Sequence, residues 1–558
     1  MRYEHDSIGE IEVPDAVYYS AQTARAMTNF PISGIPISHH EHLLRGFAMV
    51  KIAAARANVK LQKLDPAIGA AIEQAAQEIM AGRLHDQFPV DVMQGGAGTS
   101  TNMNFNEVLA NRALELSGHK IGEFEHIHPN DHVNLSQSTN DTYPTAVRVA
   151  IILAQRSLSE ALDGLASAFE AKAGEFYDIV KLGRTEMQDA VPMTLGQEFG
   201  AFATTIREDI ARLVDAVELL TDVNLGGTAI GTRINADPTY GPIAIAELAA
   251  LSGVPFIQSG NLLQASWDMG AFVMFSAVLK RIATKLSKIS NDLRLLSSGP
   301  RGGLAEISLP SRQPGSSIMP GKVNPVIPEM VNLVCFQVIG HDLAITLAAE
   351  GGQLQLNAFE PLIAHNTLDS ISLLTNAVNT LSKLCVQGIQ ANPENCLKHL
   401  EVSTATLTAL VPYIGYERAA ALAKAPLATG STIRELAKTV LPDANIDEIL
   451  DAKVLAGMAL KRELSVKLVA AAQHTYSGTN VRLSVLSPNK RTARFRSYFA
   501  VRSCCGALAP LEFPHALSLA WFYSDHINWR AVTLSINAIV LAVVFQKTGK
   551  KYRLSACK

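Results

Sequence analysis

A long uninterrupted helical run constrains the fold of this chain more than any other feature. Residues 271–298 contain no glycine or proline, and their apolar side chains recur every three or four positions. This spacing predicts one buried stripe on a helix roughly 40 Å long, at about 1.5 Å per residue. Similar runs occupy residues 144–177, 195–220 and 326–349. Helices of this length usually pack along one another, so the pattern predicts an all-α bundle whose exposed stripes dock on copies of the chain.

Composition places the chain among helix-biased globular proteins. Its 558 residues are 48% apolar and 6% aromatic, and a length above roughly 250 to 300 residues favours several domains. Residues 1–460 hold 48 acidic and 33 basic side chains, whereas residues 461–558 hold 3 acidic and 15 basic ones. The acidic body argues against a nucleic-acid-binding protein.

Neither a secretory signal nor a cofactor motif is visible. The N-terminal segment MRYEHDSIGEIEV is charged where a signal needs an apolar core, and the 6 cysteines lack CxxC spacing, so we expect a cytoplasmic protein with free thiols. Glycine-rich pieces at 95–98 and 226–231 lack nucleotide-binding spacings. The cluster His39, His40 and His42 is the one metal candidate, and a solvated helix start is the favoured interpretation. We therefore predict no metal and no cofactor.

Four polar segments interrupt the helical runs. They read GGAGTSTNMNFNE (95–107), HPNDHVNLSQSTND (128–141), GRTEMQDAVPM (183–193) and QPGSSIMPGKVNPVIPEM (313–330). Each precedes or opens a predicted helix, where free N–H groups and the helix dipole favour an anion. Capping explains such residues in any one segment, but all four hold more hydroxyls and amides than capping requires. The last segment, with its glycines and prolines, is more typical of a site than of a connector.

The segment GSSIMPGKVNP (315–325) resembles the signature of the aspartase/fumarase superfamily. The other three segments resemble its remaining active-site regions in the expected order, and the resemblance covers about residues 1–460. VIPE, LSQSTND and GGAGTSTNMN resemble the aspartase branch, whereas fumarases tend toward TQCE, MSQSSND and SGSGTQTNMN. The resemblance implies reversible deamination of L-aspartate to fumarate and ammonia, with hydration of fumarate to malate as the alternative.

The resemblance also implies an architecture. A long central helix bundle (141–395) would lie between a smaller N-terminal domain (1–140) and a small C-terminal domain (396–460), in a homotetramer whose active sites are each built from three subunits. Residues 461–558 depart from the family as a basic extension, and their apolar run 531–545 is shorter than the roughly 20 residues that span a bilayer. An appended segment without a catalytic role is the favoured interpretation, and a membrane-contacting extension is the alternative.

The resemblance assigns roles to individual residues. Ser316 matches the catalytic base, which removes a proton from the carbon beside the β-carboxylate of aspartate. A serine hydroxyl is a poor base in water, so its alkoxide requires nearby cationic or N–H donors and a closed, dry loop. The other matching positions are Thr99, Ser138, Thr139 and Ser317 for the β-carboxylate, Thr185, Lys322 and Asn324 for the α-carboxylate, and Asn140 for the leaving amine.

Glu186 departs from the fumarase pattern, which has a histidine after GRT. A carboxylate pairs with a substrate ammonium but gains little from a neutral hydroxyl, so Glu186 favours an amino-acid substrate over malate. The alternative is that Glu186 points to solvent. Glu329 matches an acid that orients the histidine in the fumarase pattern. A non-catalytic structural helix-bundle protein would need none of these polar residues, so their retention favours an enzyme.

Overall fold

The computed structural model describes residues 1–429 and 432–457. Contacts divide the chain into two units, Met1–Ala456 and Gly457–Lys558, and all the described residues except Gly457 belong to the first unit. The predictions for the basic extension from residue 461 onward lie outside the described residues. The three domain boundaries predicted before it stay predictions.

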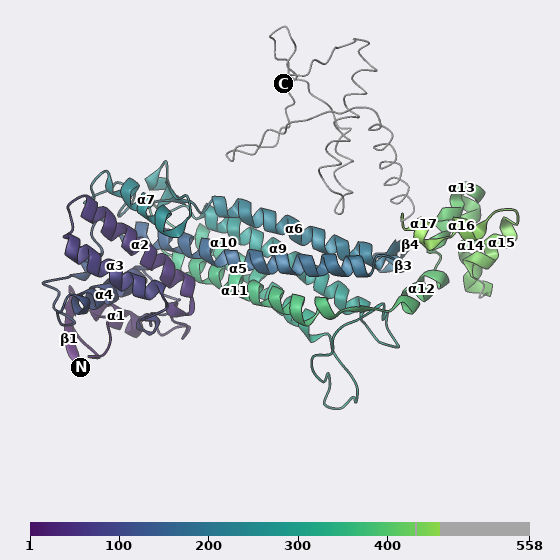
Figure 1. Ribbon diagram of the computed structural model, residues 1–558, viewed down its shortest axis with the longest axis horizontal. Helices are drawn as coiled ribbons and strands as arrows, with labels where there is room; N and C mark the ends of the chain where they lie inside the picture. The colour runs from purple at the N-terminus through teal and green to yellow at the C-terminus, as the bar shows by residue number, and fades with distance from the viewer. Residues whose placement is uncertain (430–431, 458–558) are drawn as a thin grey trace, which may run out of the picture. The chain divides into compact units, whose positions relative to one another are not determined.

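Long helices form the centre of the first unit (Figure 1). Those of 24 residues or more among the described residues are α5 (Thr139–Glu175), α6 (Leu195–Glu218), α9 (Gly270–Leu296), α10 (Val326–Glu350) and α11 (Glu360–Leu384). α5 packs against α6 and α11, and α10 packs against α9 and α11. Four of the five coincide with the periodic runs apart from a few residues at their ends. The predicted all-α bundle is confirmed.

Helices α9 and α10 run antiparallel. Asp342, late in α10, accepts a hydrogen bond from Ser276, early in α9. Asn332, early in α10, donates to Ser287, late in α9. The loop between these two helices therefore lies at the end of the bundle where α9 stops and α10 starts.

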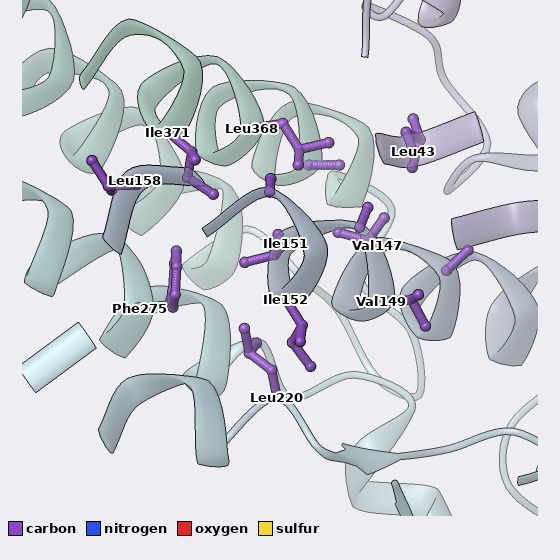
Figure 2. Close-up of a cluster of buried hydrophobic side chains, with 14 of the residues drawn as sticks. Leu43, Val147, Val149, Ile151, Ile152, Leu158, Leu220, Phe275, Leu368 and Ile371 are labelled. Carbon is purple, nitrogen blue, oxygen red and sulfur yellow. The ribbon is translucent and has the colours of Figure 1, made fainter. Parts of the chain in front are cut away.

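The core of the bundle is built from the predicted apolar stripes. Figure 2 shows a cluster of buried hydrophobic side chains that includes Val147, Ile151 and Leu158 of α5, Phe275 of α9 and Ile371 of α11, and all five side chains are buried. Burying a side chain of this size stabilises the fold by about 1.5–3 kcal/mol. The packed stripes hold the helix ends, where the polar segments lie, in fixed positions.

The N-terminal part of the unit packs on α5 through α2. Its elements are β1 (Arg2–Asp6), β2 (Gly9–Val13), α1 (Ala21–Asn29), η1 (Ile37–His39), α2 (Glu41–Lys60), α3 (Pro66–Met80), η2 (His85–Gln87), α4 (Thr99–Leu116) and η3 (Pro129–Val133). α2 contacts α3, α5 and α7, and the ring of Phe47 on α2 stacks on Phe105 of α4 with centroids 4.5 Å apart. These contacts fix α4 against the start of the bundle.

The remaining elements are short. They are β3 (Val180–Thr185), β4 (Gln188–Thr194), β5 (Asp222–Val223), α7 (Tyr240–Ser252), β6 (Ile257–Gln258), α8 (Leu262–Ala265), β7 (Ile307–Ser308), η4 (Val386–Gly388), β8 (Gln390–Ala391), α12 (Pro393–Val402), η5 (Ala405–Leu410), α13 (Val411–Ile414), α14 (Tyr416–Thr429), α15 (Ile433–Val440), α16 (Ile446–Ile449) and α17 (Ala452–Leu455). The eight strands in the described part of the chain form two-stranded sheets. Strand pairs this short leave little period-two signal, which is why the sequence did not predict them.

One helix of the described chain, α10, is long and apolar enough to cross a membrane. Its buried face packs on α9 and α11 and includes the hydrogen-bonded polar residues Asn332 and Asp342. Its other face exposes Leu333, Phe336, Leu343 and Leu347, each at least 60% accessible. α10 is thus a bundle helix that keeps an unpartnered apolar stripe.

Candidate active site

The serine loop connects β7 to α10 and is closed by its own hydrogen bonds. The N–H of Gly315 donates to the carbonyl of Lys322 at 2.7 Å, and Asn324 Nδ2 donates to the carbonyl of Gly315 at 2.9 Å. A Cβ at Gly315 would lie 2.7 Å from the Lys322 oxygen and 2.8 Å from the Asn324 nitrogen. Only glycine allows the two limbs of the loop to approach this closely.

Ser316 sits at the centre of this loop with two donors on its oxygen. The backbone N–H groups of Ile318 and Met319 donate to Ser316 Oγ at 3.1 and 2.9 Å. Donors aimed at an oxygen favour its negatively charged form. Ser316 is half-buried, whereas Ser317 and Lys322 are exposed. The turn therefore provides the N–H donors that a serine alkoxide requires.

The start of α5 holds three of the predicted carboxylate and amine contacts. Ser138 is the N-cap: its Oγ accepts from the N–H of Asn140 at 3.3 Å, and its own N–H donates to Asp141 Oδ1 at 3.0 Å. Thr139 is buried behind it. Asn140 Nδ2 donates to the carbonyl of Ala229 at 2.7 Å, which fixes the amide. The structure shows the capping role of this helix start, and its predicted binding role stays a prediction.

Thr99 opens α4 beside the same helix start. Its hydroxyl donates to the carbonyl of Gly96 at 2.8 Å, and its side chain is exposed. Gly98, with φ +87°, would place a Cβ 2.2 Å from the ring of Tyr143 on α5. A glycine at this position lets the start of α4 pack directly against α5, so Thr99 and Thr139 lie on neighbouring elements.

A buried polar network that the sequence analysis missed lies behind Thr139. Lys51 on α2 is fully buried, and its Nζ donates to Asn134 Oδ1 at 3.1 Å and to Gln137 Oε1 at 3.0 Å. Asn102 Nδ2 lies 3.1 Å from both Asn134 Oδ1 and Thr139 Oγ1. Because Thr139 accepts from Asn102, its own hydroxyl proton is free to donate elsewhere. Burial lowers the pKa of Lys51 to about 7.

The segment 183–193 lies within the β3–β4 hairpin, which the sequence did not predict, and the hairpin leads directly into α6 at Leu195, as the sequence predicted. Glu186 and Met187 form its turn with φ of +54° and +65°, and both Thr185 and Glu186 are exposed. Arg184 anchors the hairpin by donating to the buried carboxylate of Glu306 at 2.7 Å. In a single chain Glu186 points to solvent.

Two groups of predicted site residues occupy opposite ends of the bundle. Arg312, just before the serine loop, donates to the carbonyl of Leu384 at the end of α11. Lys172, near the end of α5, donates to the carbonyl of Ile389 just beyond α11. The serine loop and the hairpin thus lie where α5 ends, whereas Thr99 and the 138–140 segment lie where α5 begins. α5 has 37 residues, which corresponds to about 55 Å of helix.

Glu329, a predicted site residue, and His40, part of the histidine cluster considered for a metal, are both placed by the structure. Glu329 lies half-buried in the first turn of α10. His40 is buried, and its Nε2 lies 2.8 Å from His365 Nδ1 on α11, so the predicted solvated helix start is wrong for His40.

The chain matches two protein-family models. The model described as a lyase matches residues 9–340, and the model of the fumarase C C-terminus matches residues 407–457. Among curated relatives, the aspartate ammonia-lyase of Pseudomonas fluorescens is 58% identical over 453 residues, which are 81% of this chain and 95% of that protein. The aspartate ammonia-lyase of Escherichia coli strain K12 is 50% identical over 464 residues, which are 83% of this chain and 97% of that protein.

Solved structures give the same family. A fumarate lyase:delta crystallin from Brucella melitensis bound to cobalt is 57% identical, with a TM-score of 0.79, over 82% of this chain and 99% of that one. A class II fumarase from Schistosoma mansoni has the same TM-score and the same coverage at 36% identity. The chain therefore belongs to the aspartase/fumarase superfamily, in its aspartate ammonia-lyase branch.

Proposed function

We propose that this chain catalyses the reversible deamination of L-aspartate to fumarate and ammonia, with Ser316 as the base. The observation that carries the mechanism is the pair of N–H groups donating to Ser316 Oγ at 3.1 and 2.9 Å. The observation that carries the reaction is the 50–58% identity to aspartate ammonia-lyases over most of the chain.

The reaction makes one strong demand on the protein. Removing a proton from the β-carbon of aspartate puts a second negative charge on the neighbouring carboxylate, and the C–N bond then breaks as the amine leaves with its electron pair. Most of the catalysis must come from donors that bind this dianion more strongly than the substrate. In our proposal these donors are the hydroxyls of Thr99, Ser138, Thr139 and Ser317.

The α-carboxylate needs contacts that do not change during the reaction, and the amine needs contacts that allow it to leave. Lys322 supplies a positive charge for the α-carboxylate, with Asn324 and Thr185 as further donors. Asn140 contacts the departing amine. Glu186 pairs with the ammonium of the substrate, and Glu329 supports the site from the first turn of α10.

The proposal requires several copies of the chain. The serine loop and the start of α5 lie about 55 Å apart along the helix, so one chain does not complete a site. Copies that pack antiparallel along their bundles would bring the loop of one to the α5 start of another. The exposed stripe of Leu333, Phe336, Leu343 and Leu347 on α10 is suited to such packing. We propose a homotetramer whose sites are each shared by three subunits.

The alternatives have weaker support. The class II fumarase of S. mansoni is 36% identical, less than the aspartate ammonia-lyases, and the carboxylate of Glu186 would gain little from malate. A purely structural role would leave the donors around Ser316 without a purpose. The proposal includes a cytoplasmic location, with which the buried free thiols Cys335, Cys385 and Cys396 are compatible.

One assay tests the proposal directly. Purified protein mixed with L-aspartate should form fumarate, followed by the ultraviolet absorbance of its conjugated double bond, and should release an equal amount of ammonia. The matched control is Ser316→Ala, which keeps the fold but lacks the base. If the wild-type protein hydrated fumarate to malate efficiently and left aspartate unchanged, the aspartase assignment would be wrong.

A further inference from the structure

The loop that follows α4 brings together three side chains with metal-ligating atoms. His119, Glu123 and His126 each offer one ligand atom, and these atoms all lie within 4.8 Å of one another. His119 Nδ1 and Glu123 Oε2 are 3.6 Å apart, which is too long for a hydrogen bond. The two imidazole rings stack with centroids 3.8 Å apart and planes 18° from parallel. None of these residues belongs to the candidate active site.

The separation between His119 and Glu123 suits two ligands of one metal ion. Two ligands at about 2.0–2.1 Å from a tetrahedral zinc ion are about 3.3–3.4 Å apart, close to the 3.6 Å between His119 and Glu123. The backbone N–H of Lys120 donates to Glu123 Oε2 at 3.0 Å, which orients the carboxylate as an outer hydrogen bond does in known metal sites. Two nitrogens and one carboxylate oxygen are typical of a site for zinc or a similar divalent ion, with water as a fourth ligand.

The loop backbone is shaped to present these groups. Gly118 and Gly122 have φ of +83° and +91°, so they turn the chain on either side of His119. The N–H of His119 donates to the carbonyl of Leu114 in the last turn of α4, and the N–H of Gly122 donates to Asn111 Oδ1. His119 is therefore fixed to α4, whereas His126 lies shortly before η3.

We propose that His119, Glu123 and His126 bind one divalent transition-metal ion of the zinc type. The ion joins the end of α4 to the segment that leads into η3 and onward to Ser138. None of its ligands belongs to the candidate active site, so its role is to stabilise this connection and not to take part in the chemistry. The proposal departs from the sequence prediction that the chain has no metal site.

The test uses the untagged full-length protein, stripped with a chelator and titrated with Co²⁺ alone. Cobalt reports its ligands through visible absorption: a site with three protein ligands gives bands much stronger than those of the hydrated ion. We expect the wild-type protein to show these bands. Glu123→Gln should bind Co²⁺ at least about tenfold more weakly than the wild-type protein, because loss of a residue that only hydrogen-bonds a metal ligand already weakens metal binding by about that factor. Co²⁺ should also raise the midpoint of thermal unfolding of the wild-type protein but not that of Glu123→Gln.

Glu125→Gln is the matched control, because Glu125 is an exposed acid in the same loop outside the ligand set. It should bind Co²⁺ as the wild-type protein does. His126→Ala, a change at an exposed side chain, provides a second variant if Glu123→Gln fails to fold. Equal Co²⁺ affinity in the wild-type protein, Glu123→Gln and His126→Ala would overturn the proposal, as would equal losses in Glu123→Gln and Glu125→Gln.

Discussion

Subunit mixing is the sharpest test of the proposed homotetramer with shared active sites. The serine loop and the start of α5 lie at opposite ends of a helix of 37 residues, about 55 Å long. A chain with Ser316→Ala keeps its Asn140, and a chain with Asn140→Ala keeps its Ser316. Each homotetramer should be inactive, because every site in it lacks one of the two groups. A mixed tetramer should regain sites in which each group comes from an intact chain.

The size of the recovery follows from the assembly. When equal amounts of the two chains assemble at random, a site receives an intact Ser316 in about half of cases and, from a different chain, an intact Asn140 in about half. About one quarter of the sites should therefore be complete, and activity should return to about one quarter of the wild-type value. If both residues came from the same chain, no site would be complete.

The two chains would carry different affinity tags, be co-expressed and be purified over both tags, and fumarate formation would be followed by ultraviolet absorbance. Selection for both tags removes the homotetramers, so the recovery should be slightly above one quarter. The control pair is Ser316→Ala with Lys322→Ala. These residues lie on one loop that is closed by the Gly315 to Lys322 hydrogen bond, so the control should show poor rescue. Equal recovery in both pairs, or none in either, would refute the shared site.

The other predictions concern single residues. Ser316→Ala should lower kcat by about 10²–10⁴-fold with KM nearly unchanged, and a near-normal kcat would instead make Glu186 the first candidate for the base. Lys322→Ala should raise KM and lower kcat/KM, because Lys322 contacts the α-carboxylate in both the ground state and the transition state. Phe336→Glu should place a charge on the exposed α10 stripe and yield inactive smaller species by light scattering; an intact, active tetramer would argue against that interface. Burial lowers the pKa of Lys51 from 10.5 to about 7, so between pH 7 and 10.5 the unfolded chain binds more protons than the folded chain. The free energy of unfolding should therefore rise with pH in this range, by at most about 1.4 kcal/mol per pH unit. In urea titrations at several pH values, Lys51→Met should remove this rise.

The sequence predicted the bundle well because its signal is local. The stripe of residues 271–298 anticipates α9, and the run 326–349 anticipates α10 almost to the residue. The hairpin of β3 and β4 was missed because its strands are short and its turn residues, Glu186 and Met187, are not glycine or asparagine although both adopt positive φ. Local patterns report long helices far better than short strand pairs.

The site residues also fall into those that local sequence patterns predicted and those that they did not. The motif residues were readable because each motif is contiguous, including the turn that presents Ser316. The network of Lys51, Asn134 and Asn102 was not, because Lys51 and Asn134 are separated by 83 positions and are joined only by the fold. A lysine within the apolar run FAMVKIAAA was the one signal, since a buried lysine needs partners. Which polar segments share an end of α5 also became known only from the structure, because it depends on the directions of the helices.

The self-closed serine loop has a consequence for the timing of catalysis. The hydrogen bonds from Gly315 to Lys322 and from Asn324 to Gly315 hold the turn around Ser316 together before any substrate arrives. Its two N–H donors therefore need not be ordered anew in each turnover, and the conformational entropy of arranging them is lost once, when the chain folds. Movement of the loop toward the rest of the site would carry an already assembled base, so the barrier of each cycle should contain the displacement of the loop but not its reorganisation.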